Sequence, residues 1–406
     1  MRPSPACPST ARPPGPPIRR MKTMNARISL SPADYPDSPL AAALKQPLLL
    51  GLFLPIQNGG WSPSTLPRTT DWSFDYNKAL TLKAEALGFD LAFGLAQWIG
   101  KDGYGGALKY REQTIDPFVT VAALASLTSR ILLISTIHVL YGPWHPLHLA
   151  KFSATLDHIS GGRFGINMVT GYAPREPRMF GTTQIEHDER YARADEFIGI
   201  VERLWASHEN ISIDGSYWKL EEAFVSPRPR YGRPILVNAT GSPAGFAYAA
   251  QHSDLVFITS PAGAEIEAAL AALPAHVAAL KAQAKAVGRE VRALINPMIV
   301  CRPTEKEAKD YHAAILAHAD TAAVEGFLAH HAVGDSQAWK NHKSEHRILG
   351  GNIQIIGSPE QVADKIIRLK QAGIDGIQVA FFDFQPDLDF FGEAVLPLLK
   401  QAGLRI

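Results

Sequence analysis

The sequence predicts an α/β fold, a (β/α)8 TIM barrel with insertions. Short apolar runs alternate with helical segments along most of the chain, and regular alternation of this kind indicates a parallel sheet. The runs are continuously apolar, as expected for strands buried on both faces. Eight of them favour a closed barrel over an open sheet. The chain also contains no G-x-G-x-x-G after the first strand and no P-loop, the patterns of the open nucleotide-binding sheets.

The strands and helices follow from apolar runs and from the residues that end them. The predicted strands are 48–55, 90–96, 130–138, 163–169, 233–239, 254–259, 290–301 and 376–382. Glycines and prolines mark several boundaries: Pro55 ends the first strand, and Gly88 ends the first helix. The predicted helices are 75–88, 117–129, 147–158, 188–205, 243–252, 264–287 and 359–373.

One barrel domain is expected over residues 46–404, because single barrels with insertions commonly reach this length. Residues 1–30 are excluded from it. That stretch is rich in proline, cannot bury much surface, and is expected to be a disordered tail. It has no apolar core segment, so it does not resemble a secretory signal, and Met21 or Met24 could be the true start.

Charge and cysteine content exclude several classes of partner. The chain has 40 basic and 39 acidic residues, a net charge of +1 and no basic block, so nucleic acid and anionic membranes are poor candidates. No apolar run approaches the ~18–20 residues of a transmembrane helix. The two cysteines, Cys7 and Cys301, predict no disulfide and a reducing, cytoplasmic location.

Two insertions interrupt the alternation of strands and helices. Residues 210–231 predict a small hairpin followed by an extended link. Residues 321–351 show no clear periodicity, and a long unpatterned segment in a compact domain is typical of a mobile lid. This second segment carries four histidines whose spacing matches no common metal site, so no metal is expected: His330, His331, His342 and His346.

Polar residues at the carboxyl ends of the strands are the first candidates for function, because barrel active sites lie there. Asn58 follows the first strand, and Gln97 follows the second. Thr136 and Asn167 lie inside the third and fourth strands. Asparagine is disfavoured in strands and must find hydrogen bonds when buried, so Asn167 either binds a ligand or ties neighbouring backbone together. Threonine is a good strand former, which leaves Thr136 ambiguous.

The loop after the fourth strand contains a glycine and an acid. Gly171 allows a ligand to approach the backbone closely. Glu176 is either part of a site or a solvated loop acid.

Two helix starts could bind an anion. With Asp188 as the expected N-cap, Arg190 falls in the first helical turn, where a cation is unfavourable and a bound anion would compensate it. The alternative is a local ion pair with a neighbouring acid. Ser242 is the expected N-cap of another helix, with Pro243 as its first residue, and its free N–H groups could receive a phosphate.

Taken together and in order, several segments resemble a known family. They are LPIQNGGW, DWSFDYNKAL, SGGRFGINMVTGY, HDERYARADEF, FVSPRPR, ATGSPAG and FFGEAVLPLL. The sequence resembles the luciferase-like flavin-dependent monooxygenases, in the branch that holds pyrimidine oxygenase, dimethylsulfone monooxygenase and alkanesulfonate monooxygenase. The resemblance covers roughly residues 46 to 404 and implies a bacterial-luciferase-like barrel.

The resemblance also implies a cofactor, reduced FMN, which a separate NAD(P)H-dependent flavin reductase supplies. Ala96 and Gln97 would line its isoalloxazine ring. Asn167 and Glu176 would hydrogen-bond the flavin. In the pyrimidine-oxygenase pattern, Thr136 and Asn167 also form the small pocket where dioxygen meets the ring.

The phosphate of FMN would be held by Arg190, Tyr191 and Ser242, which agrees with the two helix starts noted above. The family resemblance further implies a homo-oligomer, a dimer or tetramer. Composition and spacing, as noted above, predict no nucleic acid, membrane or metal partner.

The implied function is that of a two-component, FMNH2-dependent monooxygenase that uses dioxygen to oxygenate a small organic substrate. An organosulfur compound, a sulfone or sulfonate with C–S cleavage, is the first expectation, because DWSFDYNKAL and GPWHP resemble dimethylsulfone monooxygenase most. The sequence departs from each relative after TGY, at Gln97-Trp98 and in the lid, so the substrate does not follow from the fold. Candidate substrate contacts are His138, His145, Arg175 and Arg178.

Three alternatives stay open. The first is ring opening of a nitrogen heterocycle, as in pyrimidine oxygenase. The second is a deazaflavin-dependent dehydrogenase on the same barrel, which would need no oxygen; the pair Thr136 and Asn167 and the segment HDERY speak against it. The third is a non-catalytic flavin-binding protein, which the full set of strand-end polar residues disfavours.

Overall fold

Eight parallel strands close into a barrel in the computed structural model, which describes residues 30–334 and 344–406. Around the barrel they follow the order β1-β2-β3-β4-β7-β8-β9-β12, and β12 pairs with β1 to close it. Their bounds are β1 Leu49–Phe53, β2 Leu91–Gly94, β3 Leu132–His138, β4 Phe164–Val169, β7 Ile235–Thr240, β8 Leu255–Ile258, β9 Arg292–Ile295 and β12 Gly376–Phe381. The predicted (β/α)8 TIM barrel is confirmed.

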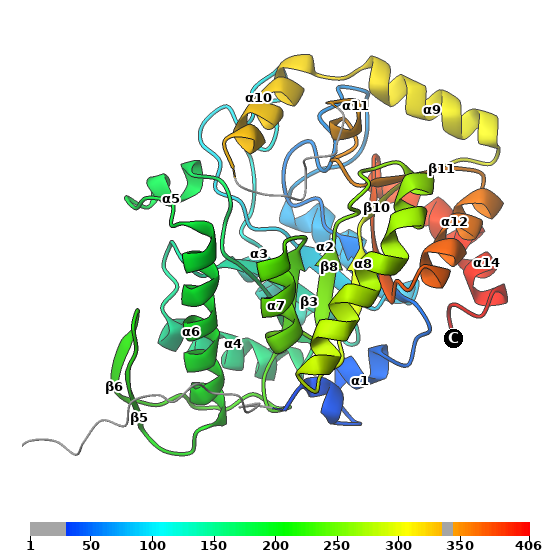
Figure 1. The fold of residues 1–406 in the computed structure, drawn as a ribbon. Helices are drawn as coiled ribbons and strands as arrows, with labels where there is room; N and C mark the ends of the chain where they lie inside the picture. Colours follow the sequence, from blue (N-terminus) through cyan, green and yellow to red (C-terminus); the bar gives the residue numbers. More distant parts are fainter. Residues whose placement is uncertain (1–29, 335–343) are drawn as a thin grey trace, which may run out of the picture.

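Helices cover the outside of the barrel, as Figure 1 shows for the neighbouring α6, α7 and α8. Because both faces of most strands are covered, β1, β2, β3, β8 and β12 are buried along their whole length. The covering helices are α2 Phe74–Ala86, α3 Pro117–Ala125, α4 Pro146–Ser160, α6 His187–Ala206, α7 Pro243–His252, α8 Ile266–Ala286 and α12 Pro359–Gln371.

Helix α12 shows how local sequence fixes an element. Ser358 and Gln361 form the predicted capping box, with Pro359 at the first helical position. Val362, Ile366 and Leu369 recur at helical spacing and are buried against the barrel. Burial of each such side chain contributes about 1.5–3 kcal/mol.

The expected strand 290–301 is wrong in one respect, because the chain forms two strands there. β9 ends at Ile295, and β10 (Pro297–Cys301) begins two residues later. β12 pairs with β9 near its start and with β10 near its end, so the sheet divides at Asn296. β10 then continues to β11 (Ile353–Gly357), a strand that the sequence analysis did not predict.

The two insertions are built differently from each other. Residues 210–231 contain the expected hairpin, formed by β5 (Ile211–Asp214) and β6 (Lys219–Ala223). The segment 321–351, expected to be unpatterned, instead begins with α10 (Thr321–Ala332), for which Asp320 is the N-cap. Residues 335–343 of the expected lid, with His342, lie outside the described residues, and so does the proline-rich tail up to residue 29.

Further helices complete the chain. Three of them lie along one end of the barrel: α9 (Glu305–Ala317), α10 and α11 (Ser344–Arg347) (Figure 1). The sequence analysis did not predict α9. The short elements are a 3-10 turn Pro32–Asp34, α1 Pro39–Ala43, α5 Arg175–Met179, α13 Phe384–Phe390, a π-helical turn Phe391–Val395 and α14 Leu396–Gln401. None of the helices within the described residues combines the length and apolar character needed to cross a membrane.

A buried ion pair joins the amino-terminal ends of β7 and β8. Arg233 Nη1 and Nη2 donate to the two carboxylate oxygens of Asp254 over 2.7 and 2.8 Å. The hydroxyl of Ser31 and the N–H of Leu236 also donate to this carboxylate. The N-terminal segment is thereby fastened to the end of the barrel opposite the site.

Candidate active site

A cavity of about 290 Å³ opens at the carboxyl ends of the barrel strands. Its floor is aromatic: Phe93 packs edge-to-face against Phe53 and Phe257, with ring centroids 5.3 and 4.9 Å apart. Polar side chains surround this floor. Every residue expected to bind the flavin or meet dioxygen lines the cavity: Ala96, Gln97, Thr136, Asn167, Glu176, Arg190, Tyr191 and Ser242. These residues come together because the carboxyl ends of parallel strands converge; their roles stay a prediction.

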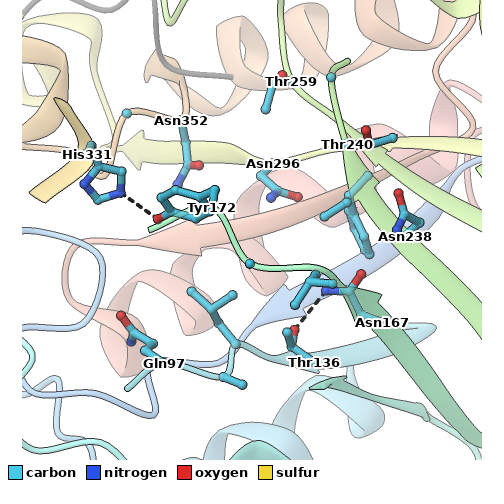
Figure 2. A pocket seen from close by; sticks show the side chains of 18 of the residues that line it. Gln97, Thr136, Asn167, Tyr172, Asn238, Thr240, Thr259, Asn296, His331 and Asn352 are labelled. Atoms are coloured by element: carbon cyan, nitrogen blue, oxygen red, sulfur yellow. Dashed lines mark hydrogen bonds between the residues drawn. The ribbon is translucent and has the colours of Figure 1, made fainter. Parts of the chain in front are cut away.

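Thr136 and Asn167 are joined by a hydrogen bond across neighbouring strands. They face each other in the register of β3 and β4, and Asn167 Nδ2 donates to Thr136 Oγ1 over 2.9 Å (Figure 2). Asn167 is 1% exposed, and its Oδ1 has no hydrogen-bond partner within the described part of the chain. The Asn167 side chain bonds another side chain and no backbone group, so the alternative that it ties neighbouring backbone together is wrong. Its buried Oδ1 is available to accept a hydrogen bond from a ligand.

Gln97 presents a free donor to the same cavity. Its Oε1 accepts a hydrogen bond from Arg111 Nη1 over 3.1 Å, whereas its Nε2 is buried without a partner among residues 30–334 and 344–406. Ala96 precedes it and also lines the cavity. Trp98, next in sequence, packs outward against Phe180 and does not line the cavity.

Glu176 lies on α5 in a cluster of polar side chains. The hydroxyl of Tyr141 donates to its carboxylate, and His138 Nε2 lies 3.4 Å from Glu176 Oε2. The rings of His138 and Tyr141 stack with centroids 4.8 Å apart. Desolvation on burial lowers the pKa of His138, although the charge of Glu176 opposes this shift. Because the Glu176 side chain is only 13% exposed, the alternative of a solvated loop acid is wrong.

Arg190 lies in the first turn of α6, as expected, but the cap of this helix was misassigned. Glu186, not Asp188, is the N-cap, and its carboxylate accepts the N–H groups of Asp188 and Glu189. Arg190 is buried and donates from Nη1 to the carbonyl of Ile185 over 2.8 Å. Glutamate is not a favoured N-cap, which explains why the pattern pointed to the aspartate.

The start of α7 forms a narrow cradle beside Arg190 and Tyr191. Ser242 is its N-cap, as predicted, and accepts from the N–H of Gly245 over 3.1 Å. A Cβ on Gly245 would lie 1.7 Å from Thr240 Oγ1 and 2.7 Å from the hydroxyl of Tyr191. Only glycine fits there, so the helix N-terminus can approach these hydroxyls closely. Its N–H groups and Arg190 favour an anion.

Several lining residues were missed by the sequence analysis. Asn238 and Asn296 each bury a side-chain oxygen, and Asn352 buries an amide nitrogen, without a partner among the described residues. All three line the cavity, and Figure 2 shows them with Thr240 and Thr259. An asparagine directly after an apolar strand, as at 296, is the signal that could have found them.

α10 contributes an aromatic wall and a neutral histidine. His331 Nδ1 bonds the carbonyl of Phe327 over 2.7 Å, and carbonyls only accept, so Nδ1 carries the hydrogen. His331 Nε2 therefore accepts from the hydroxyl of Tyr172, 2.8 Å away (Figure 2). Burial lowers the pKa of His331 to about 3, which keeps the ring neutral near pH 7. This bond joins α10 to the loop that follows β4.

Of the four candidate substrate contacts, only His138 lines the cavity. His145 instead caps α4, where its Nδ1 accepts from the N–H of Leu147. Arg175 and Arg178, on α5, do not reach the cavity lining. No group of three potential metal ligands occurs among the described residues.

Asn58, the polar residue after the first strand, does not line the cavity either. Its Nδ2 donates to the carbonyls of Leu108 and Lys109, and its Oδ1 accepts from the N–H of Gln113. It fastens the loop between β2 and α3.

Comparison with known proteins decides the family. Residues 49–376 match the model of the luciferase-like monooxygenases, which spans most of the chain. The chain belongs to the luciferase-like monooxygenase family. The resemblance read from the quoted segments is thereby confirmed, and so are the classification as an enzyme and the reaction class, monooxygenation.

Three similar proteins illustrate this membership. The FMNH(2)-dependent dimethylsulfone monooxygenase of Pseudomonas putida is 32% identical over 368 residues, covering 88% of this chain and 97% of that protein. Pyrimidine monooxygenase RutA of Allorhizobium ampelinum is 32% identical over 369 residues, 86% and 96% of the two chains. The crystal structure of riboflavin lyase superimposes with a TM-score of 0.75 at 24% identity, over 88% of this chain and 92% of that one.

Proposed function

We propose that this luciferase-like monooxygenase is the oxygenase component of a two-component system. It would bind reduced FMN, supplied by a separate NAD(P)H-dependent flavin reductase, and use dioxygen to oxygenate a small organic substrate. The observation that carries this proposal is the cavity at the strand ends, where buried amide groups without partners among the described residues lie in the same lining as the N-terminus of α7. The relatives that are FMNH(2)-dependent by name support the choice of cofactor.

The residues present fit a flavin mononucleotide. Its phosphate requires donors and positive charge, and Arg190, Tyr191 and the N-terminus of α7 at Ser242 supply both. The ring system presents donors and acceptors along one edge. Asn167 Oδ1 and Gln97 Nε2 are a buried acceptor and a buried donor without partners among the described residues, and are matched to such an edge. Glu176 is the other candidate partner.

When bound, reduced FMN would supply the two electrons with which one oxygen atom of dioxygen enters the substrate and the other leaves as water. The protein's own part is positioning and exclusion of water. The hydrogen bond from Asn167 fixes the Thr136 hydroxyl, and both side chains line the cavity, where they would border the dioxygen. Phe53, Phe93 and Phe257 keep the floor apolar.

An organosulfur compound, a sulfone or sulfonate cleaved at its C–S bond, is the substrate we propose first. The dimethylsulfone monooxygenases of two Pseudomonas species, each 32% identical over 88% of this chain, support this choice. The second candidate is ring opening of a pyrimidine, favoured by relatives named pyrimidine monooxygenase that reach the same identity.

The proposal includes three further features. Residues 321–351 would act as a lid, since Phe327 and His331 of α10 already line the cavity. The protein would assemble as a dimer or tetramer. It would be located in the cytoplasm, where a reductase and NAD(P)H are available. Light scattering on the purified protein would check the assembly.

The test is a reconstitution with any NADH-dependent flavin reductase, FMN and air. Dimethyl sulfone, methanesulfonate and uracil are offered separately, and disappearance of each is followed by mass spectrometry. Consumption of one of them that requires both reduced FMN and this chain supports the proposal. If none of these compounds, nor any member of a wider sulfone, sulfonate and pyrimidine panel, is oxygenated, the proposed function is wrong.

A further inference from the structure

We propose that Arg111 selects a substrate with an anionic head group, a sulfonate or a carboxylate, over a neutral analogue. This inference rests on the proposed function, since it concerns the substrate end of the same cavity. Arg111 lies in the loop between β2 and α3 and lines the cavity, yet neither the family resemblance nor the strand-end pattern pointed to it.

The charge of Arg111 is buried, and the described residues place no opposite charge in contact with it. The side chain is 4% exposed and forms no ion pair with any of the described residues. Within residues 30–334 and 344–406 its side chain forms one hydrogen bond, from Nη1 to the neutral Oε1 of Gln97. A buried guanidinium is normally paired, because removal of a charge from water is costly. An anionic ligand would supply the missing charge.

Aromatic rings hold the guanidinium in place. Its carbon lies 4.8 Å from the ring centre of Trp61, 5.0 Å from that of Tyr110 and 5.5 Å from that of Phe327. These contacts compensate part of the lost hydration. Aromatic rings accept no conventional hydrogen bond from the guanidinium edge formed by Nε and Nη2. This edge has no acceptor among the described residues, and Nε is fully buried. That edge matches the two oxygens of an oxyanion head group.

The backbone of Arg111 is held in one conformation by its neighbours. Its φ of 64° is in the left-handed region, which a non-glycine residue adopts only when its surroundings hold it there. Its N–H donates to the carbonyl of Asn58, whose side chain bonds the same loop on both sides of Arg111. The loop therefore presents an oriented guanidinium before any ligand arrives.

Arg111 contacts a different set of residues from the proposed phosphate site. Arg111 is tied by contact to Gln97, Trp61 and Phe327, whereas Arg190 and Ser242 belong to α6 and the start of α7. A second guanidinium, that of Arg347, lies 5.6 Å from the same Phe327 ring and adds positive potential. The carboxylate of Glu176, also in the cavity lining, accepts from Tyr141 and lies beside His138.

Methanesulfonate and dimethyl sulfone provide a matched pair of probes. They share a tetrahedral sulfur and similar size, and they differ in one oxygen against one methyl and in net charge. Their binding to the full chain is measured by calorimetry, without cofactor and with oxidised FMN present. Acetate as a third probe separates a carboxylate from a sulfonate preference.

We expect the wild-type chain to bind methanesulfonate or acetate at least tenfold more tightly than dimethyl sulfone. In Arg111→Gln this ratio, measured without FMN, should fall to about one. Arg111→Lys should recover part of the preference, because it keeps the charge and loses the planar edge. Arg228→Gln, at an exposed arginine outside the cavity lining, should behave as wild type.

Two results would overturn the inference: equal or no binding of the charged and neutral probes, or an unchanged ratio in Arg111→Gln. Circular dichroism of each variant shows whether it is folded. A chain that binds anions through Arg111 but never binds reduced FMN would contradict the proposed function and leave the anion site standing.

Discussion

The side-chain amide of Asn167 donates to the hydroxyl of Thr136 over 2.9 Å, between residues that face each other on β4 and β3. The bond fixes which way the Asn167 amide points, because its nitrogen is engaged and its oxygen is left without a partner among the described residues. Orientation of one buried amide by a neighbouring hydroxyl is how the barrel prepares this part of the site.

Removal of either group should therefore impair oxygenation by different amounts. Thr136→Val keeps the shape and deletes the acceptor, and we expect about a tenfold loss of rate, the value of one hydrogen bond. Asn167→Ala removes the positioned group itself and should cost about a hundredfold or more. Substrate-dependent product formation measures both. Thr155→Val, at an exposed threonine on α4, is the control and should have no effect.

The phosphate site proposed at Arg190, Tyr191 and the start of α7 predicts a difference between FMN and riboflavin. Arg190→Gln and Ser242→Ala should each weaken binding of reduced FMN, by about ten- to a hundredfold for the arginine, because a charge-assisted hydrogen bond is lost. Binding of reduced riboflavin, which lacks the phosphate, should change little. Anaerobic titration with both flavins measures this. Equal losses for the two flavins would place these residues elsewhere than at the phosphate.

Gly245 should tolerate no side chain. In Gly245→Ala the new methyl would overlap Thr240 Oγ1 and crowd the Tyr191 hydroxyl, so the start of α7 must shift and the affinity for reduced FMN should fall. Gly199→Ala, in open space on α6, is a matched control that should stabilise the chain by about 0.5–1 kcal/mol. A fully active Gly245→Ala would show that the cradle is not used.

The buried pair Arg233 and Asp254 should contribute to the loss of stability in acid. Burial alone would raise the pKa of Asp254, but the charge and hydrogen bonds of Arg233 outweigh it and lower this pKa. The unfolded chain then binds a proton more readily, so the stabilisation is present above the unfolded pKa near 4 and is lost as pH falls through the folded value.

Asp254→Asn should lower the free energy of unfolding at pH 7 by about 3–5 kcal/mol, because it leaves a buried guanidinium without its partner. Urea titrations at pH 7 and at lower pH would show a smaller acid response in the variant than in the wild type. Glu267→Gln, which breaks an exposed ion pair with Arg368, should change little. Equal acid responses in wild type and Asp254→Asn would contradict the assignment.

The barrel could be predicted because its strands are buried on both faces and so read as continuous apolar runs. The strand-end residues Gln97, Thr136 and Asn167 could be predicted as one site for the same geometric reason. Division of the predicted strand 290–301 at Asn296 could have been inferred from Pro297. Proline has no backbone N–H to donate to a neighbouring strand. α10 could not, because its alanine-rich sequence has no apolar stripe.

Arg111 shows the limit of this reasoning. It lies in an irregular loop, and its burial depends on Trp61 and Phe327, which are distant in sequence. No local sequence pattern predicts that these three side chains lie in contact. Glu186 shows the same limit at short range, because its capping role depends on the backbone geometry of the loop before α6.

The most direct test of the account is the rate at which reduced FMN reoxidises in this protein. Anaerobic protein with reduced FMN is mixed with oxygenated buffer, and the return of oxidised-flavin absorbance is followed in a stopped-flow instrument. We predict a time course clearly different from that of free flavin, which reverts toward the free course in Asn167→Ala. If reduced FMN does not bind, or reoxidises as it does free in solution, the account of this cavity as an oxygenase site is contradicted.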